Sequence, residues 1–195
     1  MRSAGRLPDS LLALLSGGTW AFSRSLVHKA GDAYTVAGTC SWSPCAGAPA
    51  EGIPSADSAS ATDGSGSSGG GAPPPPPPPA ALRYEERGRM LRGAAEFVAD
   101  VKQAHTWHLR GPLRAEVFFS DGRPFHGVGF ARLAAGEASR CVHQCAPDPY
   151  EGELALVEPL PGEGGPLSLE VAWRVTGPEK DYTSRTRFWR AGGGR

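Results

Sequence analysis

Two histidines, an aspartate and a tyrosine in the second half of this sequence could carry acid–base or metal chemistry. The imidazoles of His126 and His143 titrate near neutral pH, and Asp148 and Tyr150 follow His143 within one short segment. Together they could transfer protons in an isomerisation or a hydrolysis, hold a metal, or supply the axial histidine of a haem. The structural alternatives are a hydrogen bond from His126 to the backbone and a turn capped by Asp148, which precedes a proline.

A guanidinium and a carboxylate form a second candidate group, with a tyrosine beside them. Arg24, Tyr84 and Glu86 are predicted on the inner faces of strands, where an unsatisfied polar group costs about 1–3 kcal/mol. Arg24 and Glu86 could be a buried ion pair that fixes the fold. Alternatively, they could hold the polar head of a ligand, because the fork of an arginine suits bidentate partners.

Five more side chains complete the candidate ligand-binding set. Trp107 and Trp173 are predicted on the inner faces of later strands, and Arg187 on that of the last strand. Lys180 and Tyr182 lie at the turn before the last strand, where they could close over the mouth of a barrel. The structural alternative for Lys180 is a solvated turn.

The composition excludes some classes of function. The 195 residues include 20 basic and 20 acidic side chains, so the chain lacks the basic character typical of nucleic-acid binding or of a polybasic membrane patch. No nucleophile elbow, strand-linked phosphate loop or zinc-protease helix motif occurs. No apolar run has the roughly 18–20 residues of a membrane span, and Leu11–Leu15 is too short for a secretory signal, so we expect a cytoplasmic location.

Alternation of apolar and polar residues with a period of two runs through most of the chain and predicts strands. Before them, Ser10 caps a short helix over Leu11–Leu15 that Gly17 ends. The predicted strands cover Trp20–Leu26, Ala33–Trp42, Leu82–Met90, Phe97–Leu109, Leu113–Phe119, a run from Arg123, Ala138–Cys145, Glu151–Val157, Leu167–Thr176 and Asp181–Arg190. The pattern predicts an all-β fold, an antiparallel up-and-down barrel of about 8–10 strands.

The strand faces place the candidate side chains. Charges at Arg83, Glu85 and Arg87 mark a solvent face, so Tyr84 and Glu86 between them point inward.

A two-residue hairpin is predicted at Asp121-Gly122, between two apolar runs. It pairs Val117 with His126, so these two share the inner face. One face of the preceding long strand carries Val101, Gln103, His105 and Trp107.

The segment Ser43–Pro79 differs in composition from the rest of the chain. It consists mostly of Ala, Gly, Ser and Pro and ends in the proline run Pro73–Pro79, so it cannot bury enough surface to order itself. Because strand patterns flank it, we interpret it as a disordered insertion within a single barrel domain over residues 8–191. The proline run could bind a proline-recognition partner such as an SH3 domain or profilin, or it could be a spacer.

The four cysteines do not form a recognisable zinc motif. Cys40 and Cys45 are separated by four residues, and Cys141 and Cys145 by three, whereas zinc knuckles commonly use two. In a cytosolic protein we expect reduced, structural thiols and no bound metal.

The tripeptide Gly18-Thr19-Trp20 opens the first strand after a short helix and resembles the G-x-W opening of calycins, the superfamily of lipocalins and fatty-acid-binding proteins. The resemblance implies a barrel in which an arginine of the last strand packs across the Trp20 indole, and Arg187 and Arg190 are the candidates. Nitrobindin, a haem-binding calycin, shares this opening, but no block like its axial-histidine block is found here.

Five blocks extend the resemblance over nearly the whole chain outside the insertion. In order, they are Gly18–Trp20, Leu82–Gly88, Asp121–His126, His143–Gly152 and Gly177–Tyr182. Together they resemble an uncharacterised calycin-like family, domain of unknown function 6314. Its members have a short hairpin tip where this chain has Ser43–Pro79. The family has no assigned activity, so the resemblance implies a fold and leaves the function open.

The leading hypothesis is therefore a barrel that binds a small, partly apolar molecule, with the polar head held by Arg24, Tyr84, Glu86 and His126. The alternatives are a small-molecule enzyme that uses the His, Asp and Tyr group, a haem-binding barrel, or a structural module that recruits a partner through its prolines. The sequence identifies no cofactor.

Overall fold

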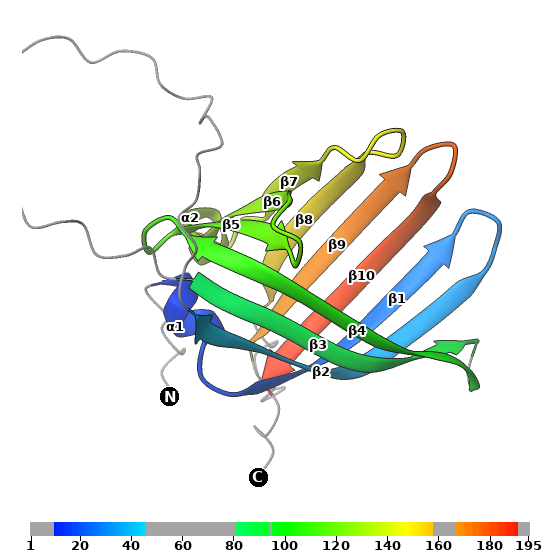
Figure 1. The fold of residues 1–195 in the computed structure, drawn as a ribbon, viewed down its shortest axis with the longest axis horizontal. Helices are drawn as coiled ribbons and strands as arrows, with labels where there is room; N and C mark the ends of the chain where they lie inside the picture. Colours follow the sequence, from blue (N-terminus) through cyan, green and yellow to red (C-terminus); the bar gives the residue numbers. More distant parts are fainter. Residues whose placement is uncertain (1–9, 46–80, 94, 158–166, 191–195) are drawn as a thin grey trace, which may run out of the picture.

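Ten strands and two short helices make up the part of the chain that the computed structural model describes, residues 10–45, 81–93, 95–157 and 167–190 (Figure 1). The elements are α1 (Leu11–Leu15), β1 (Thr19–His28), β2 (Ala33–Cys45), β3 (Ala81–Arg92), β4 (Glu96–Leu109), β5 (Arg114–Phe119), β6 (Pro124–Gly129), α2 (Phe130–Ala134), β7 (Ser139–His143), β8 (Tyr150–Val157), β9 (Ser168–Thr176) and β10 (Asp181–Arg190).

All ten strands belong to one antiparallel sheet, in the order β6-β5-β4-β3-β2-β1-β10-β9-β8-β7. Neighbours in the sheet are neighbours in sequence, except that β1 pairs with β10. The sheet curls until β6 and β7 approach each other, which makes a nearly closed up-and-down barrel (Figure 1). The predicted fold class is confirmed.

Side chains, rather than a strand ladder, join the two edge strands β6 and β7. The backbone N–H of Gly129 donates to Oγ of Ser139 at 2.9 Å. Phe125 of β6 packs against His143 of β7 with 5.0 Å between ring centroids.

Helix α2, which leads from β6 to β7, departs from the prediction that only strands follow the first helix. Its residues Phe130 and Leu133 lie one turn apart, and both are buried. Five residues are too few for a helical period to stand out against a strand pattern.

The predicted short helix is present as α1, and it closes one end of the barrel (Figure 1). Oγ of Ser10 caps it by accepting a hydrogen bond from the N–H of Ala13 at 3.2 Å. Leu14 and Leu15 are buried against the core, and the indole N–H of Trp20 donates to the carbonyl of Leu15 at 3.3 Å.

Arg190 ties the last strand to this closed end. Its guanidinium carbon lies 4.6 Å from the centroid of the Trp20 ring. Its N–H groups donate to the carbonyls of Leu14 at 2.8 Å, of Ser16 at 2.9 Å and of Gly17. The arginine–tryptophan contact implied by the calycin resemblance is thus present, and Arg190 makes it.

The turn between β5 and β6 has three residues, not the predicted two. The N–H of Gly122 donates to the carbonyl of Phe119 at 3.0 Å, and the N–H of Phe119 donates to the carbonyl of Arg123 at 2.9 Å. Gly122 has a φ of 85°, which glycine adopts at little cost. It is therefore the last residue of a three-residue loop, whereas the prediction made Asp121 and Gly122 the two central residues.

Strand β2 continues to Cys45, so the first three residues of the predicted insertion belong to this strand. Ser43, Pro44 and Cys45 pair with Arg83, Leu82 and Ala81 of β3. The pairing of β2 with β1 ends at Ser41, so Pro44 needs no N–H for that neighbour.

The remainder of the predicted insertion, with Pro73–Pro79, lies outside the described residues, so the insertion, its proline-recognition partner and the domain limits stay predictions. Neither helix in the described part of the chain is long and apolar enough to cross a membrane.

Candidate ligand-binding site

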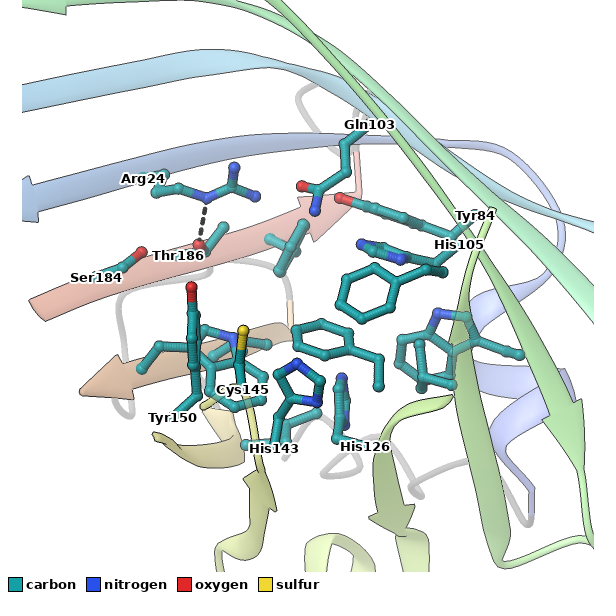
Figure 2. Close-up of a pocket in the computed structure, with 18 of the residues that line it drawn as sticks. Arg24, Tyr84, Gln103, His105, His126, His143, Cys145, Tyr150, Ser184 and Thr186 are labelled. Carbon is teal, nitrogen blue, oxygen red and sulfur yellow. Dashed lines mark hydrogen bonds between the residues drawn. The ribbon is translucent and has the colours of Figure 1, made fainter. Parts of the chain in front are cut away.

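A cavity of about 450 Å³ lies inside the barrel, and all ten strands contribute to its lining (Figure 2). Its volume falls in the range of roughly 300–1,000 Å³ that is usual for small-molecule sites. Along β10 the lining runs from Tyr182, beside the β9–β10 turn, to Phe188, which is buried toward α1.

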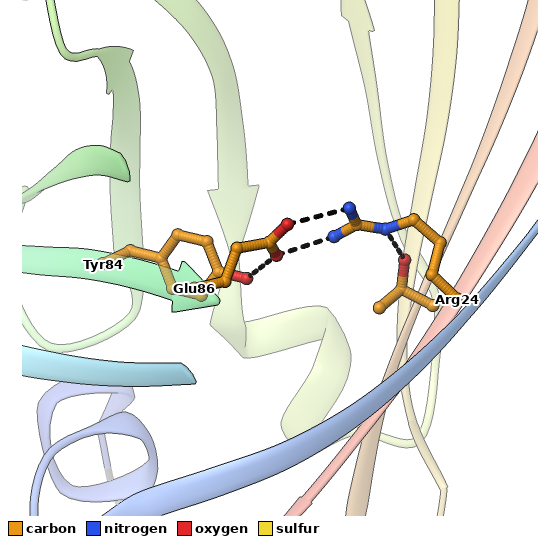
Figure 3. Close-up of polar contacts among 4 residues, drawn as sticks. Arg24, Tyr84 and Glu86 are labelled. Atoms are coloured by element: carbon orange, nitrogen blue, oxygen red, sulfur yellow. Dashed lines mark hydrogen bonds and ion pairs between the residues drawn. The ribbon is translucent and has the colours of Figure 1, made fainter. Parts of the chain in front are cut away.

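Arg24 on β1 and Glu86 on β3 form a bidentate ion pair in the cavity wall (Figure 3). Nη1 of Arg24 donates to Oε1 of Glu86 at 2.9 Å, and Nη2 donates to Oε2 at 2.7 Å. Nε of Arg24 donates to Oγ1 of Thr186 at 2.9 Å, and the Tyr84 hydroxyl donates to Oε2 of Glu86. The Glu86 side chain is 0% exposed and that of Arg24 is 17% exposed, so the guanidinium faces the cavity and the carboxylate lies behind it.

A glycine pair lets Arg24 reach Glu86 across the intervening strand β2. Phe22, Gly38 and Gly88 form one row on the inner face of β1, β2 and β3, between the row of Arg24 and the row of Glu86. A Cβ on Gly88 would lie 3.0 Å from Cζ of Phe22. The Arg24 guanidinium carbon lies 5.4 Å from the centroid of the Phe22 ring. A side chain at Gly88 would fill the space that the Phe22 ring uses, and one at Gly38 would run into the backbone of β3.

The hydrogen-bond network keeps Arg24 charged and Tyr84 neutral in this wall of the cavity. Burial opposes the charge of Arg24, but the hydrogen bond and the negative charge of Glu86 outweigh it and raise the pKa of Arg24. Burial and the Glu86 carboxylate also raise the pKa of Tyr84, and they raise the pKa of Cys40 to about 12. Arg24 therefore stays charged, and Tyr84 stays protonated as a donor.

A stack of rings in the cavity lining runs from Tyr84, beside Glu86, to Trp173. Tyr84 and His105 stack with 5.9 Å between centroids and 10° between planes, and His105 and Phe125 with 5.4 Å and 25°. Phe125 and Trp173 continue the stack with 5.2 Å and 20°. A flat apolar group could continue such a stack through offset ring contacts.

A β-bulge places two consecutive aromatic side chains in this cavity. Phe118 pairs with Pro124 and Val117 pairs with His126, so Phe125 is the extra residue in β6. The turn, longer by one residue than predicted, shifts the pairing of β5 and β6 by one residue, and the bulge shifts it back. Val117 and His126 therefore pair as predicted. Both Phe125 and His126 line the cavity.

Three histidines surround Phe125, with centroid distances of 5.4 Å for His105, 4.6 Å for His126 and 5.0 Å for His143. Nδ1 of His126 lies 3.2 Å from the carbonyl oxygen of Gly127, so it is the nitrogen that carries the proton. Desolvation lowers the pKa of His126 to about 4, and it lowers the pKa of His105 and of His143 as well. All three rings are uncharged at neutral pH.

We expect the free energy of unfolding to decrease as the pH falls from about 6.5 to about 4. His126 stays neutral in the folded barrel down to about pH 4, whereas in the unfolded chain it takes up a proton near pH 6.5. The unfolded state therefore binds more protons in this window, and one histidine accounts for up to about 1.4 kcal/mol per pH unit. Urea denaturation at about pH 7 and about pH 5 should show a smaller loss for His126→Gln than for the wild type. Equal losses of stability in His126→Gln and the wild type would contradict the lowered pKa of His126.

Three ring nitrogens in the cavity lining have no hydrogen-bond partner among the described residues: Nε1 of Trp42, Nδ1 of His105 and Nε1 of Trp107. The residues are 3%, 7% and 7% exposed. A buried polar group without a partner costs about 1–3 kcal/mol, so each such group needs an explanation.

Cationic side chains line the cavity, and no carboxylate of the described residues does. The cations are Arg24, Arg123 and Lys180. Nζ of Lys180 donates to the Tyr150 hydroxyl at 3.2 Å, whereas Arg123 forms an exposed ion pair with Asp121 at 2.8 Å. The field in the cavity therefore favours a negative group.

Comparison with known proteins settles the family. Residues 16–190 match the model of a family of unknown function, DUF6314. This chain belongs to that family. No curated protein matches it.

The barrel of this DUF6314 protein is similar to the structure of the S-type phycobiliprotein lyase CPES from Guillardia theta, with a TM-score of 0.53. The identity is 10%, and the match covers 93% of each chain. At this identity the likeness shows the fold alone, and it agrees with the calycin-like barrel expected from the G-x-W opening.

Most of the residues singled out in the sequence lie around the cavity of the DUF6314 protein. Those in the lining are Arg24, Tyr84, Trp107, His126, His143, Tyr150, Trp173, Lys180 and Tyr182. Glu86 lies directly behind Arg24. Their role in binding stays a prediction.

Asp148 does not line the cavity and forms no acid–base group with the histidines. It is 1% exposed, and its Oδ1 accepts a hydrogen bond from the backbone N–H of Glu179 at 3.1 Å. The approach depends on Gly177, where a Cβ would lie 2.0 Å from that oxygen. Asp148 therefore caps the β9–β10 turn, which was the structural alternative.

Arg187 lies on the outer face of β10, so its predicted inward position is wrong. Its side chain is 53% exposed, and its Nε donates to Oγ of Ser168 at 3.1 Å. Thr186 and Phe188 on either side are buried inside the barrel, and the alternation of a strand then turns Arg187 outward.

Several cavity-lining residues were not singled out in the sequence: Gln103, His105, Phe119, Arg123, Phe125, Cys145, Ser184 and Thr186. Alternation with the buried Phe188 could have indicated Ser184 and Thr186. Nothing local indicates Phe125, because its inward position depends on the bulge. Among the described residues, no three His, Cys, Asp or Glu side chains gather where they could hold a metal ion.

Proposed function

We propose that this barrel binds a small, partly apolar molecule in its cavity, with a polar group of that molecule against Arg24. The observation that carries the proposal is a cavity of about 450 Å³ inside the barrel that is lined by aromatic rings and by the Arg24 guanidinium. An occupant would bury the apolar surface of these rings, which stabilises the complex.

The fold supports the same proposal in a coarser way. The solved barrel of similar fold is named a phycobiliprotein lyase. For this chain we propose only the property that the cavity itself supports, which is the uptake of a small molecule. A proton-transfer enzyme has less support, because Asp148 is committed to a turn.

The four cysteines are free thiols, which supports the cytoplasmic location as part of the proposal.

Native mass spectrometry of the protein purified without added ligand tests the proposal directly. The expected result is an extra mass that disappears on denaturation, and an absorption spectrum of the same sample distinguishes a coloured ligand or a haem from a colourless one. A bare polypeptide mass, combined with no stabilisation by a set of small apolar compounds, would overturn it.

Filling the cavity should prevent this binding, whereas the same change on the outer face should not. Val171 and Ala172 are neighbours on β9, and Val171 lines the cavity. We expect Val171→Trp to lose the co-purified mass and Ala172→Trp to keep it, because successive strand residues point to opposite faces. Circular dichroism confirms that both variants are folded, and retention of the mass by folded Val171→Trp would contradict a site inside the barrel.

A further inference from the structure

We infer that the ligand is a flat, conjugated or aromatic acid whose carboxylate binds Arg24 and whose ring system stacks on the aromatic rings of the cavity. The inference rests on the proposed function and specifies the chemistry of its ligand. It is drawn from the donors left free at Arg24, from the position of Glu86, and from the orientation of the rings.

Arg24 has donors left for an anion. Three of its five N–H groups are used, two by Glu86 and one by Thr186, and the remaining two belong to the η nitrogens. Thr186 accepts from Arg24 through its oxygen, so its own hydroxyl proton is free to donate. Ser184, two residues away on the same face of β10, adds another hydroxyl to the lining. This wall therefore offers hydrogen-bond donors grouped around one cation, which is what a carboxylate requires.

Glu86 reduces the attraction that an anion in the cavity experiences, but the guanidinium lies between its carboxylate and the cavity. Its side chain is 0% exposed, and its oxygens are occupied by Arg24 and Tyr84. It acts as a positioning residue, because it holds the guanidinium in place and keeps it charged. Lys180, which donates to the neutral Tyr150 hydroxyl, adds to the positive field, and no carboxylate of a described residue lines the cavity to oppose it.

The stacked rings favour a flat partner over a flexible chain. The planes of Phe125 and Trp173 are within 20° of each other, and those of Phe125 and His105 are within 25°. A planar molecule can extend such a stack through offset ring contacts. An aliphatic chain would gain no stacking and would lose more conformational freedom.

Four probes test the two parts of the inference separately: anthracene-9-carboxylate, its methyl ester, decanoate and methyl decanoate, measured by isothermal titration calorimetry. We expect the aromatic acid to bind about 10-fold or more tightly than its ester, because the charge-assisted hydrogen bonds are lost in the ester. We expect it also to bind about 10-fold or more tightly than decanoate.

The decisive variant removes both charges of the pair, since Arg24→Met alone would leave the Glu86 carboxylate buried and unpaired. In Arg24→Met/Glu86→Gln the preference for acid over ester should disappear. The matched control is Arg187→Met, which removes an arginine from the outer face of the barrel and should keep the full preference.

Equal binding of acid and ester by the wild type, or an unchanged preference in the double variant, would overturn the role of Arg24. Decanoate binding as tightly as the aromatic acid would overturn the flat ligand. In both cases the proposed function would stand if the wild type binds either ester and Val171→Trp abolishes that binding. Failure of all four probes to bind, together with a bare native mass, would overturn both.

Discussion

Replacing Arg24 by methionine should lower the free energy of unfolding by about 3–5 kcal/mol, the cost of leaving one partner of a buried ion pair uncompensated. The Glu86 side chain is 0% exposed and receives two hydrogen bonds from Arg24, so the variant retains a carboxylate with no cation beside it. The loss is a large part of the roughly 5–15 kcal/mol that a domain has available. Urea denaturation followed by tryptophan fluorescence measures it.

The double variant Arg24→Met/Glu86→Gln should recover most of this loss. Without the carboxylate no buried charge remains, and the glutamine oxygen can still accept the hydrogen bond of Tyr84. Replacing a whole buried pair is often neutral or even stabilising, whereas removing one partner is not. If the double variant were as unstable as the single one, the loss would come from packing and not from the unpaired charge of Glu86.

Gly38→Ala should destabilise the barrel by about 3 kcal/mol or more, because the added methyl group meets backbone that cannot move aside. A Cβ at Gly38 would lie 2.0 Å from the carbonyl oxygen of Arg87 and 2.5 Å from Cα of Gly88. Strands β2 and β3 would have to separate at the row that Arg24 crosses to reach Glu86. Thermal and urea denaturation measure the loss in stability.

Gly127→Ala is the matched control on another strand of the same sheet. A Cβ at Gly127 meets nothing nearer than the carbonyl oxygen of Ala115 at 3.9 Å, which is an ordinary contact. Its expected effect is within about 1 kcal/mol in either direction, since alanine also restricts the unfolded chain. A similar loss at both glycines would show that the close approach of β2 and β3 is not what governs stability at Gly38.

The two predictions concern one arrangement, because Arg24 reaches Glu86 only across the glycine row. A stability loss in Gly38→Ala accompanied by loss of the preference for acid over ester would link the strand approach to the binding site. Arg187→Met should show neither effect, because that arginine lies on the outer face.

Local sequence patterns determined which face most side chains occupy. The charges at Arg83, Glu85 and Arg87 placed Tyr84 and Glu86 inside the barrel, and both are buried. The capped helix α1 and the tryptophan after it also followed from neighbouring residues alone. Such predictions succeed because strand alternation and helix capping depend on residues only a few positions apart.

Only the tertiary structure decided which inward side chains meet. The ion pair of Arg24 with Glu86 depends on the register of three strands and on the close approach of Gly38 to Gly88. The inward position of Phe125 depends on a bulge in β6, which compensates for a β5–β6 turn one residue longer than predicted.

Asp148 shows that spacing along the chain does not determine which side chains share a site. Its spacing from His143 suggested a shared site, but its contact with the β9–β10 turn keeps it out of the cavity. Sequence spacing fixes distance along one strand or turn, whereas a cavity is formed by residues brought together from all ten strands, and their convergence is set by register, curvature and side-chain volume.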